Sequence, residues 1–225
     1  MRHTQVGLWS KAADILSSPV KPFCDRFVIV KNYRIEQHGR LRIIGGQWKK
    51  RLIRFRGGAD LRPTPDSVRE TLFNWLAPVI VDTHCLDLFA GSGALGIEAA
   101  SRGAASVSLV EMRRATCRQL SDTLSMLNAS NVSVHCEEVL DWLDHCNARY
   151  DIVFVDPPYG EGLVDRCLHR LERCAVLNPN AQIYVECGAR EKLVIPSGWS
   201  QLQHKTAGQV AYRLFSVSET RETLG

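Results

Sequence analysis

From Thr83 onward the chain alternates between short apolar runs and amphipathic stretches, and this alternation constrains the fold most. The sequence predicts strands at 85–89, 106–110, 132–135, 151–155 and 181–186, and helices at 94–101, 113–127 and 163–173. Alternating strands and helices form a mostly parallel sheet that is covered on both faces. Residues 199–204 and 210–217 instead resemble two strands joined by a short turn. The expected fold class is therefore α/β, with a hairpin at the end of the chain.

A basic β-hairpin and one helix are predicted before this region. Residues 41–44 and 52–55 flank Gly45-Gly46 and a basic turn, which is typical of a hairpin. A helix is then expected to run through Trp75, with Pro65 in its first turn, where the missing N–H of proline costs nothing.

A glycine-rich segment follows the first strand of the alternating region. Gly91, Gly93 and Gly96 match the pattern G-x-G-x-x-G, in which glycines let the backbone turn tightly and approach a ligand. Glu111 follows the next strand, where an acid binds the hydroxyls of a ribose. The loop alone fits an NAD enzyme equally well. Asp87 favours S-adenosylmethionine, because a carboxylate repels a pyrophosphate and attracts the ammonium group of that cofactor.

A second motif, Asp156-Pro157-Pro158-Tyr159, follows the apolar run at 152–155. The prolines remove two backbone donors, so the neighbouring carbonyls remain available as acceptors. Asp156 adds a carboxylate, and Tyr159 offers a flat face for stacking. Such a site can bind the planar amino group of a nucleobase. Together with the glycine-rich segment, the motif indicates an amino-group methyltransferase.

Positive charge is concentrated near the N-terminus. Residues 1–69 carry 15 Lys and Arg against 5 Asp and Glu, while the rest of the chain carries 13 against 19. Eight basic residues between Arg40 and Arg62 face a single acidic one, and Trp48 and Phe55 are interleaved with them. This pattern indicates a polyanion partner such as nucleic acid. The alternative is a solvated basic hairpin without a partner.

Other features limit the function classes. The eight cysteines form no CxxC pair, and structural zinc sites show tight pair spacing, so we expect no metal. No apolar stretch approaches the ~20 residues of a membrane span, and no secretory signal is evident. We therefore expect a cytoplasmic protein that does not bind a membrane.

Five segments resemble the RsmD-type methyltransferases. They are Leu41–Trp48, Leu61–Trp75, Leu86–Gly96, Val155–Tyr159 and Ala207–Leu214. Members of this family methylate the exocyclic N2 of one guanine in bacterial 16S ribosomal RNA (rRNA). The resemblance implies a class I S-adenosylmethionine-dependent methyltransferase fold, which is Rossmann-like. Its sheet is mostly parallel and seven-stranded with an antiparallel last strand, and an N-terminal β-hairpin precedes it.

The resemblance and the charge pattern together suggest roles for individual residues. The expected catalytic residues are Asp156, Pro157 and Tyr159. The expected cofactor-binding residues are Asp87, Phe89, Gly91, Gly93, Leu95, Glu111, Glu138 and Val139. At Glu138 the family more often has Asn or Asp, so Glu137 is a rival for the adenine contact and a helix-start acid is the alternative role. The expected RNA-binding residues are Arg42, Lys49, Lys50, Arg51, Arg62, Thr64 and Arg69. Tyr212 and Arg213 are candidates for shaping the target side.

We expect four parts in the chain. They are a poorly ordered extension over 1–38, an RNA-binding hairpin over 39–62, a methyltransferase domain over 63–218 and a tail over 219–225. The expected substrate is 16S rRNA in a small ribosomal subunit or an assembly intermediate, and the chain is expected to be a monomer. One alternative is an N6-adenine methyltransferase on DNA or RNA, because Asp-Pro-Pro-Tyr serves adenine amino groups too. The other is a catalytically silent RNA-binding assembly factor.

Overall fold

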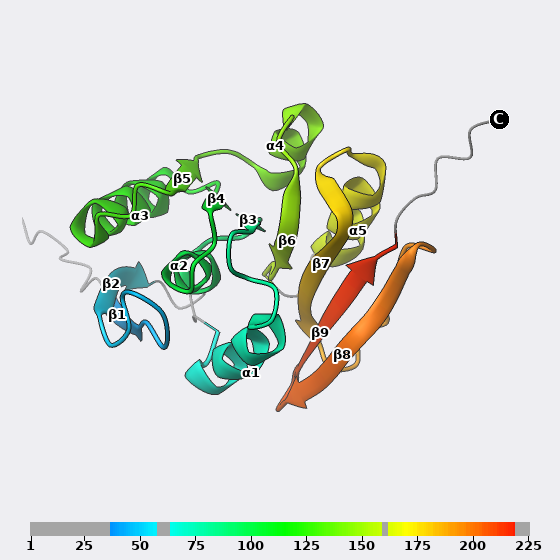
Figure 1. Cartoon of the computed structure of the whole chain (residues 1–225), viewed down its shortest axis with the longest axis horizontal. Coiled ribbons are helices and arrows are strands. Elements are labelled where there is room, and N and C mark those ends of the chain that lie inside the picture. Colours follow the sequence, from blue (N-terminus) through cyan, green and yellow to red (C-terminus); the bar gives the residue numbers. More distant parts are fainter. Residues whose placement is uncertain (1–36, 58–63, 159–161, 219–225) are drawn as a thin grey trace, which may run out of the picture. The chain divides into compact units, whose positions relative to one another are not determined.

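The computed structural model describes the backbone of residues 37–57, 64–158 and 162–218 (Figure 1). By its internal contacts the chain divides into the units Met1–Ile35 and Glu36–Gly225, and every described residue belongs to the second unit. The expected extension therefore lies outside the described residues, except for its last two. Arg62, Tyr159 and the tail at 219–225 also lie outside them.

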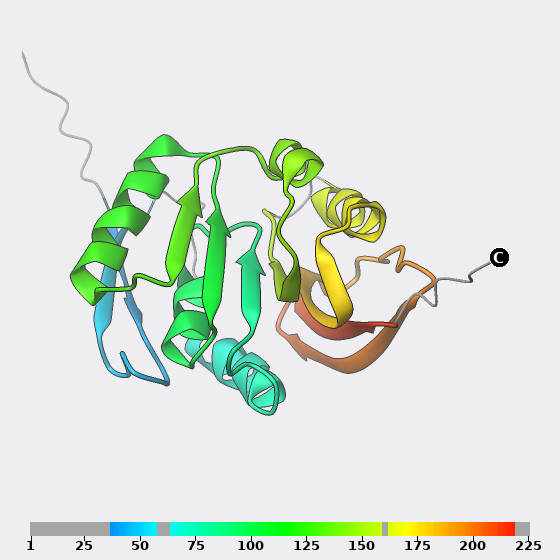
Figure 2. The same ribbon diagram turned by 45° about the horizontal axis from the view of Figure 1, so that its top comes forward.

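A seven-stranded sheet forms the centre of the second unit (Figures 1 and 2). Its strands are β3 (His84–Asp87), β4 (Ser106–Val110), β5 (Val132–His135), β6 (Tyr150–Val155), β7 (Leu177–Gly188), β8 (Trp199–Ala207) and β9 (Val210–Val217). They lie in the order β5-β4-β3-β6-β7-β9-β8. Strand β9 is antiparallel to β7 and β8, whereas the remaining pairs are parallel. This confirms the expected mostly parallel sheet with an antiparallel last strand.

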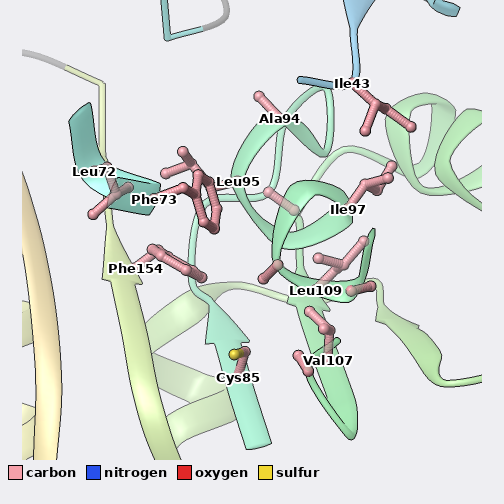
Figure 3. Packing of buried hydrophobic residues seen from close by; sticks show 14 of the residues in the cluster. Ile43, Leu72, Phe73, Cys85, Ala94, Leu95, Ile97, Val107, Leu109 and Phe154 are labelled. Atoms are coloured by element: carbon pink, nitrogen blue, oxygen red, sulfur yellow. The ribbon is translucent and has the colours of Figure 1, made fainter. Parts of the chain in front are cut away.

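Helices cover both faces of the sheet. Apolar side chains of α1 (Asp66–Leu76), α2 (Ala94–Ser101) and α3 (Arg114–Leu127) belong to one buried cluster. Those of α4 (Val139–His145) and α5 (Leu163–Arg173) belong to the other. Figure 3 shows part of the first cluster, in which the rings of Phe73 and Phe154 lie with their centroids 6.0 Å apart. Helix α4 was not among the predicted helices, because seven residues are too few to show a clear helical period. Its start corresponds to the alternative role of Glu138 as an acid at the beginning of a helix.

The expected N-terminal hairpin is present. It pairs β1 (Gln37–Arg42) with β2 (Leu52–Gly57) in antiparallel register. Leu41, Trp48 and Phe55 are buried and belong to the same core cluster as α1 and α2. The two aromatic side chains among the basic residues therefore stabilise the hairpin and are not available to stack on a nucleobase.

Three further observations concern the described part of the chain. Its seven cysteines are all free. Within it, no group of three or more His, Cys, Asp and Glu side chains is arranged to hold a metal ion. None of its helices is both long enough and apolar enough to cross a membrane.

Candidate active site

The glycine-rich loop joins β3 to α2 and brings the start of α2 against the sheet. Gly91 and Gly93 have positive φ angles of 48° and 78°, and residues other than glycine rarely adopt such angles. A Cβ atom at Gly96 would overlap the side chain of Leu109 on β4. Glycine at this position therefore allows α2 to pack close to the carboxyl ends of the strands. In an open α/β sheet, ligands bind at these strand ends.

Asp87 is the last residue of β3, and only 2% of its surface is exposed. Its Oδ2 accepts a hydrogen bond from the backbone N–H of Gly96 at 3.0 Å. Burial raises the pKa of Asp87 to about 7, although backbone N–H groups of Gly96 and Phe89 oppose that rise. Because burial disfavours the ionised carboxylate, a cationic group beside it would be strongly favoured.

Glu111 directly follows β4 and contacts the glycine-rich loop. Its Oε2 accepts the backbone N–H of Gly91 at 3.2 Å. Its Oε1 accepts both the backbone N–H of Arg113, at 2.8 Å, and the Nε–H of the same residue, at 3.1 Å. The Arg113 side chain is half exposed, so it can move aside. The carboxylate of Glu111 is thus held in place by backbone donors while one of its partners remains exchangeable.

Glu138 caps the N-terminus of α4. Its Oε2 accepts the backbone N–H groups of Leu140 at 2.7 Å and Asp141 at 3.1 Å, which is the alternative role considered for this acid. An adenine contact by this side chain would therefore have to share the capping carboxylate. Val139 is buried among the residues that pack α4 against the sheet. The rival residue, Glu137, donates its backbone N–H to the carbonyl of Glu111 at 3.1 Å.

Asp156 follows β6 and precedes the buried Pro157. The hydroxyl group of Thr64 donates to its Oδ2 at 3.2 Å. Burial raises the pKa of Asp156 well above its ordinary value, and the nearby carboxylates of Glu186 and Asp87 raise it further, while Thr64 opposes the rise. The carboxylates of Glu186 and Asp87, on the two neighbouring strands, therefore lie close enough to Asp156 to influence it.

Sequence reasoning did not single out Glu186, which is 5% exposed near the end of β7. The hydroxyl group of Tyr184 donates to its Oε2 at 2.9 Å. The parallel register pairs Phe154 with Tyr184 and Val155 with Val185. Asp156 and Glu186 are the next residues along the two strands, and the carboxylate of Glu186 is close enough to raise the pKa of Asp156. The only signal in the sequence was an acid at the end of an apolar strand.

Arg69 was expected to orient RNA or the cofactor, but its side chain is completely buried. Its Nη2 donates to the carbonyl of Arg42 at 2.9 Å and to Asp66 at 2.6 Å. Its Nε donates to the carbonyl of Thr64 at 3.3 Å, and its Nη1 lies 3.5 Å from Glu98. In this conformation the guanidinium holds the hairpin and the Thr64 segment to the core, and an RNA contact would require these bonds to open.

Glu98 of α2 was also missed by sequence reasoning. It is 1% exposed, and its carboxylate accepts the backbone N–H groups of Ile44 at 2.9 Å and Gly45 at 2.7 Å. The same carboxylate accepts the Nε–H of Arg102 at 2.8 Å. The helix that follows the glycine-rich loop therefore binds the connection between the two hairpin strands.

Ser101 makes the second attachment of that connection to α2. Its hydroxyl group donates to the carbonyl of Gly45 at 2.6 Å and accepts the N–H of Trp48 at 3.0 Å. Its carbonyl accepts the N–H of Gln47 at 2.7 Å. A Cβ atom at Gly46, where φ is 73°, would overlap this carbonyl. Only glycine thus allows such a close approach of the hairpin to α2.

The basic side chains that we expected to bind RNA differ in their partners. Arg42, Lys49, Lys50 and Arg51 are all exposed. Arg42 lies 3.4 Å from Asp66, and Arg51 donates to the carbonyl of Met126 at 3.1 Å. These four residues lie at the end of β1 and in the connection that α2 holds. The structure therefore gathers exposed positive charge on one rigidly attached loop.

The two candidates in β9 have partners within the protein. Tyr212 is buried, and its ring centroid lies 5.5 Å from that of Trp75. Arg213 donates to the sulfur of Cys187 at 2.9 Å. Tyr212 pairs with Glu186 in the antiparallel register of β7 and β9. It therefore lies on the strand next to Glu186, one of the acids at the carboxyl end of the sheet.

Comparisons with known proteins agree with this geometry. Residues 41–216 match the family model described as conserved hypothetical protein 95. The ribosomal RNA small subunit methyltransferase D of Escherichia coli is 50% identical over 178 residues, which are 79% of this chain and 90% of that protein. The protein of the same name from Haemophilus influenzae is 41% identical over 181 residues, or 79% of this chain and 94% of the relative.

Solved structures show the same fold. A putative methyltransferase from Escherichia coli superposes with a TM-score of 0.74 at 47% identity, and the match covers 80% of this chain and 99% of that one. A putative methylase from Haemophilus influenzae gives a TM-score of 0.71 at 39% identity, with 80% and 100% covered. The described part of the chain therefore has the class I methyltransferase fold. Given these identities and coverages, the chain belongs to the RsmD family of small-subunit ribosomal RNA methyltransferases.

Proposed function

We propose that this protein transfers a methyl group from S-adenosylmethionine to the exocyclic N2 of a specific guanine in 16S rRNA, within a small-subunit particle. The observation that carries the proposal is the position of Asp87 and Asp156 at the carboxyl ends of the adjacent parallel strands β3 and β6. One carboxylate ends the strand that leads into the glycine-rich loop, and the other belongs to the Asp-Pro-Pro motif, so a methyl donor and an amino acceptor would meet between them.

The residues around the loop suit S-adenosylmethionine, which supplies an electrophilic methyl group on a sulfonium when bound. The buried carboxylate of Asp87 would attract the ammonium of the methionine end, because a positive charge restores its ionised form. Glu111 would accept hydrogen bonds from the ribose hydroxyls after Arg113 moves aside. Phe89, Leu95 and Val139 are the apolar residues that we expect to complete the site.

Asp156 and Pro157 would orient the amino group of the base. The lone pair of a guanine N2 is delocalised into the ring, which makes the nitrogen a poor nucleophile. Hydrogen bonds from its two protons to the Asp156 carboxylate and the Pro157 carbonyl favour a pyramidal nitrogen with its lone pair exposed. Alignment of this kind lowers barriers by up to about 7–11 kcal/mol. Tyr159, which lies outside the described residues, is expected to stack on the base.

The raised pKa of Asp156 suits the later part of the reaction. As the nitrogen gains a methyl group it becomes acidic and must lose a proton. A carboxylate whose pKa is raised by burial and by the neighbouring acids holds a proton more readily than an ordinary aspartate does. Asp156 would therefore act first as an acceptor that orients the amino group and then as the acceptor of its proton.

The basic loop would bind the phosphates of the RNA. Arg42, Lys49, Lys50 and Arg51 are exposed, and their loop is bonded to the same helix that begins in the glycine-rich loop. A fixed distance between phosphate contacts and the methylation site helps to select one base in a large RNA. The base must leave its stack, at a cost of a few kcal/mol, which favours a looped guanine.

The experiment that tests this function uses methyl-labelled S-adenosylmethionine and small ribosomal subunits that lack base methylation. Label in N2-methylguanine, found by nucleoside analysis, would support the proposal, and reverse-transcription mapping would locate the base. Label in N6-methyladenine would overturn the substrate, and cofactor-independent RNA binding without transfer would favour an assembly factor. A cytoplasmic location and a monomeric state remain predictions.

The control for this experiment is Asp156→Ala. We expect this variant to lose methyl transfer while it retains nearly unchanged affinity for S-adenosylmethionine in calorimetry, because Asp156 is assigned to the base and not to the cofactor. A large loss of cofactor affinity would show that the residue has been assigned to the wrong ligand.

A further inference from the structure

We propose that Glu186 reads the Watson–Crick edge of the target base, by accepting the N1–H of guanine and excluding bases that carry a bare N1. This inference rests on the proposed function and specifies how the same site chooses its base. It concerns a residue of β7, whereas the amino group itself is assigned to Asp156 and Pro157 after β6.

The position of Glu186 follows from the register of the sheet. Phe154 pairs with Tyr184 in parallel β6 and β7, so the next residues on the same face are Asp156 and Glu186. Side chains alternate between the two faces of a strand, and residues two apart share a face. Phe154 and Tyr184 both belong to the cluster under α1 and α2, with their ring centroids 6.3 Å apart. The two carboxylates therefore lie on that face at the same end of the sheet.

The electrostatics support this proximity. After burial, the carboxylate of Glu186 is the group that most raises the pKa of Asp156, ahead of the carboxylate of Asp87. The hydroxyl group of Tyr184 donates to Oε2 of Glu186 at 2.9 Å, which fixes the orientation of the carboxylate. The buried carboxylate of Glu186 and the partly buried one of Asp156 repel each other when both are ionised, and a ligand with a row of hydrogen-bond donors would relieve that repulsion.

Guanine presents such a row. Its N1–H and its exocyclic amino group lie next to each other on one edge, so a base whose amino group meets Asp156 presents its N1–H to a neighbouring acceptor. Adenine and 2-aminopurine carry a lone pair at N1 instead, and this lone pair would face the carboxylate. A buried acceptor left opposite another acceptor loses its hydrogen bond and costs free energy. Glu186 is therefore placed to discriminate guanine from other bases that carry an amino group but lack N1–H.

A competing explanation gives Glu186 only a structural role as the partner of Tyr184. The two explanations differ in one respect. If Glu186 only stabilises the fold, replacing it lowers stability and total activity but leaves the preference among bases unchanged. If it reads N1, replacement with an isosteric amide changes the preference, because an amide N–H can donate to a bare N1.

The test compares guanine with 2-aminopurine at the position that the labelling experiment identifies. Small subunits are reconstituted with 16S rRNA ligated from fragments that carry either base, since 2-aminopurine keeps the C2 amino group but lacks N1–H. Single-turnover methylation rates are measured for the wild-type chain, for Glu186→Gln and for Glu172→Gln. Glu172 is the control, because it is an exposed glutamate in α5, on the opposite face of the sheet.

We expect the wild-type chain to prefer guanine by about 100-fold or more, as for a site that hydrogen-bonds its substrate and rejects an analogue lacking the donor. Glu186→Gln should lower this ratio by about 10-fold or more, because one hydrogen bond of this kind is worth more than a tenfold effect. Cofactor affinity should not change. Glu172→Gln should keep the wild-type ratio.

Two results would overturn the inference while the proposed function stands. One is equal methylation of guanine and 2-aminopurine by the wild-type chain, which needs no variant and so does not depend on whether Glu186→Gln folds. The other is an unchanged ratio in a folded Glu186→Gln chain. By contrast, absence of label at guanine N2 in the wild-type chain would overturn the proposed function itself.

Discussion

Replacement of Gly46 by alanine tests whether the basic loop is held on α2 as the structure indicates. At this position φ is 73°, and a Cβ atom would overlap the carbonyl oxygen of Ser101. The overlap is with backbone of α2, which cannot give way as a flexible side chain would. The loop must therefore move away from the helix, and the hydrogen bonds that Ser101 accepts from Gln47 and Trp48 are lost.

The expected magnitude follows from these contributions. Placing alanine in the left-handed region costs about 1–2 kcal/mol. Each of the two lost hydrogen bonds contributes about 0.5–1.5 kcal/mol, so the total for the docked loop is about 2–5 kcal/mol. Because the sheet and the glycine-rich loop do not depend on Gly46, affinity for S-adenosylmethionine should be retained while methylation of the RNA falls.

The chain offers a matched control in Gly208, between β8 and β9. Its φ is also positive, at 60°, but no atom lies within 4 Å of a Cβ atom built there. Gly208→Ala should therefore show the backbone cost alone, about 1–2 kcal/mol. The assay is urea unfolding of both full-length variants, together with hydrogen exchange of the peptide that contains Gln47 and Trp48.

The two measurements have clear expected outcomes. Gly46→Ala should be destabilised more than Gly208→Ala, and exchange of the Gln47 and Trp48 amides should accelerate by about 10-fold or more, since 1.4 kcal/mol corresponds to tenfold. Equal destabilisation of the two variants, with unchanged exchange in the loop, would refute the close packing of the hairpin on α2.

Two further predictions concern charge. Reversing Lys49, Lys50 and Arg51 to glutamate should weaken RNA binding and lower the slope of log affinity against log salt by about 2–3, whereas an unchanged slope in filter binding would remove the loop from the interface. Burial raises the folded-state pKa of Asp87 from 3.8 to about 7, so the folded chain holds a proton that the unfolded chain has released. Stability should therefore fall as pH rises from about 4 to 7, by at most about 4 kcal/mol from this group. Urea unfolding without cofactor should show a smaller fall in Asp87→Asn, and identical pH profiles for the two chains would contradict the assignment.

Local patterns in the sequence determined a large part of this structure. The alternation after residue 83 predicted the parallel sheet, and the predicted helices at 94–101 and 163–173 coincide with α2 and α5. The glycine-rich loop and the Asp-Pro-Pro-Tyr motif were recognisable because their chemistry lies in a few consecutive residues. Asp87 and Asp156 were named for the same reason, and their positions at the ends of adjacent strands follow from the topology.

Other parts of the site depended on contacts between distant segments. Trp48 and Phe55 lie among basic residues in the sequence, yet they are buried because the hairpin packs on α2 and α3. Arg69 was expected to bind RNA, but the carbonyl groups of Arg42 and Thr64 and the acids Asp66 and Glu98 surround it. No local sequence pattern predicts a buried arginine, because its hydrogen-bond and ion-pair partners come from separate elements.

The sequence by itself determined the class of fold, the cofactor loop and the acceptors for an amino group, since each of these is encoded within one short segment. Only the tertiary structure decided that Glu98 and Ser101 hold the basic loop, more than 50 residues away in the chain, and that Glu186 lies beside Asp156. The physical reason is that hydrogen bonds and charge interactions depend on distance in space. Parallel strands bring their ends together irrespective of how many residues separate them.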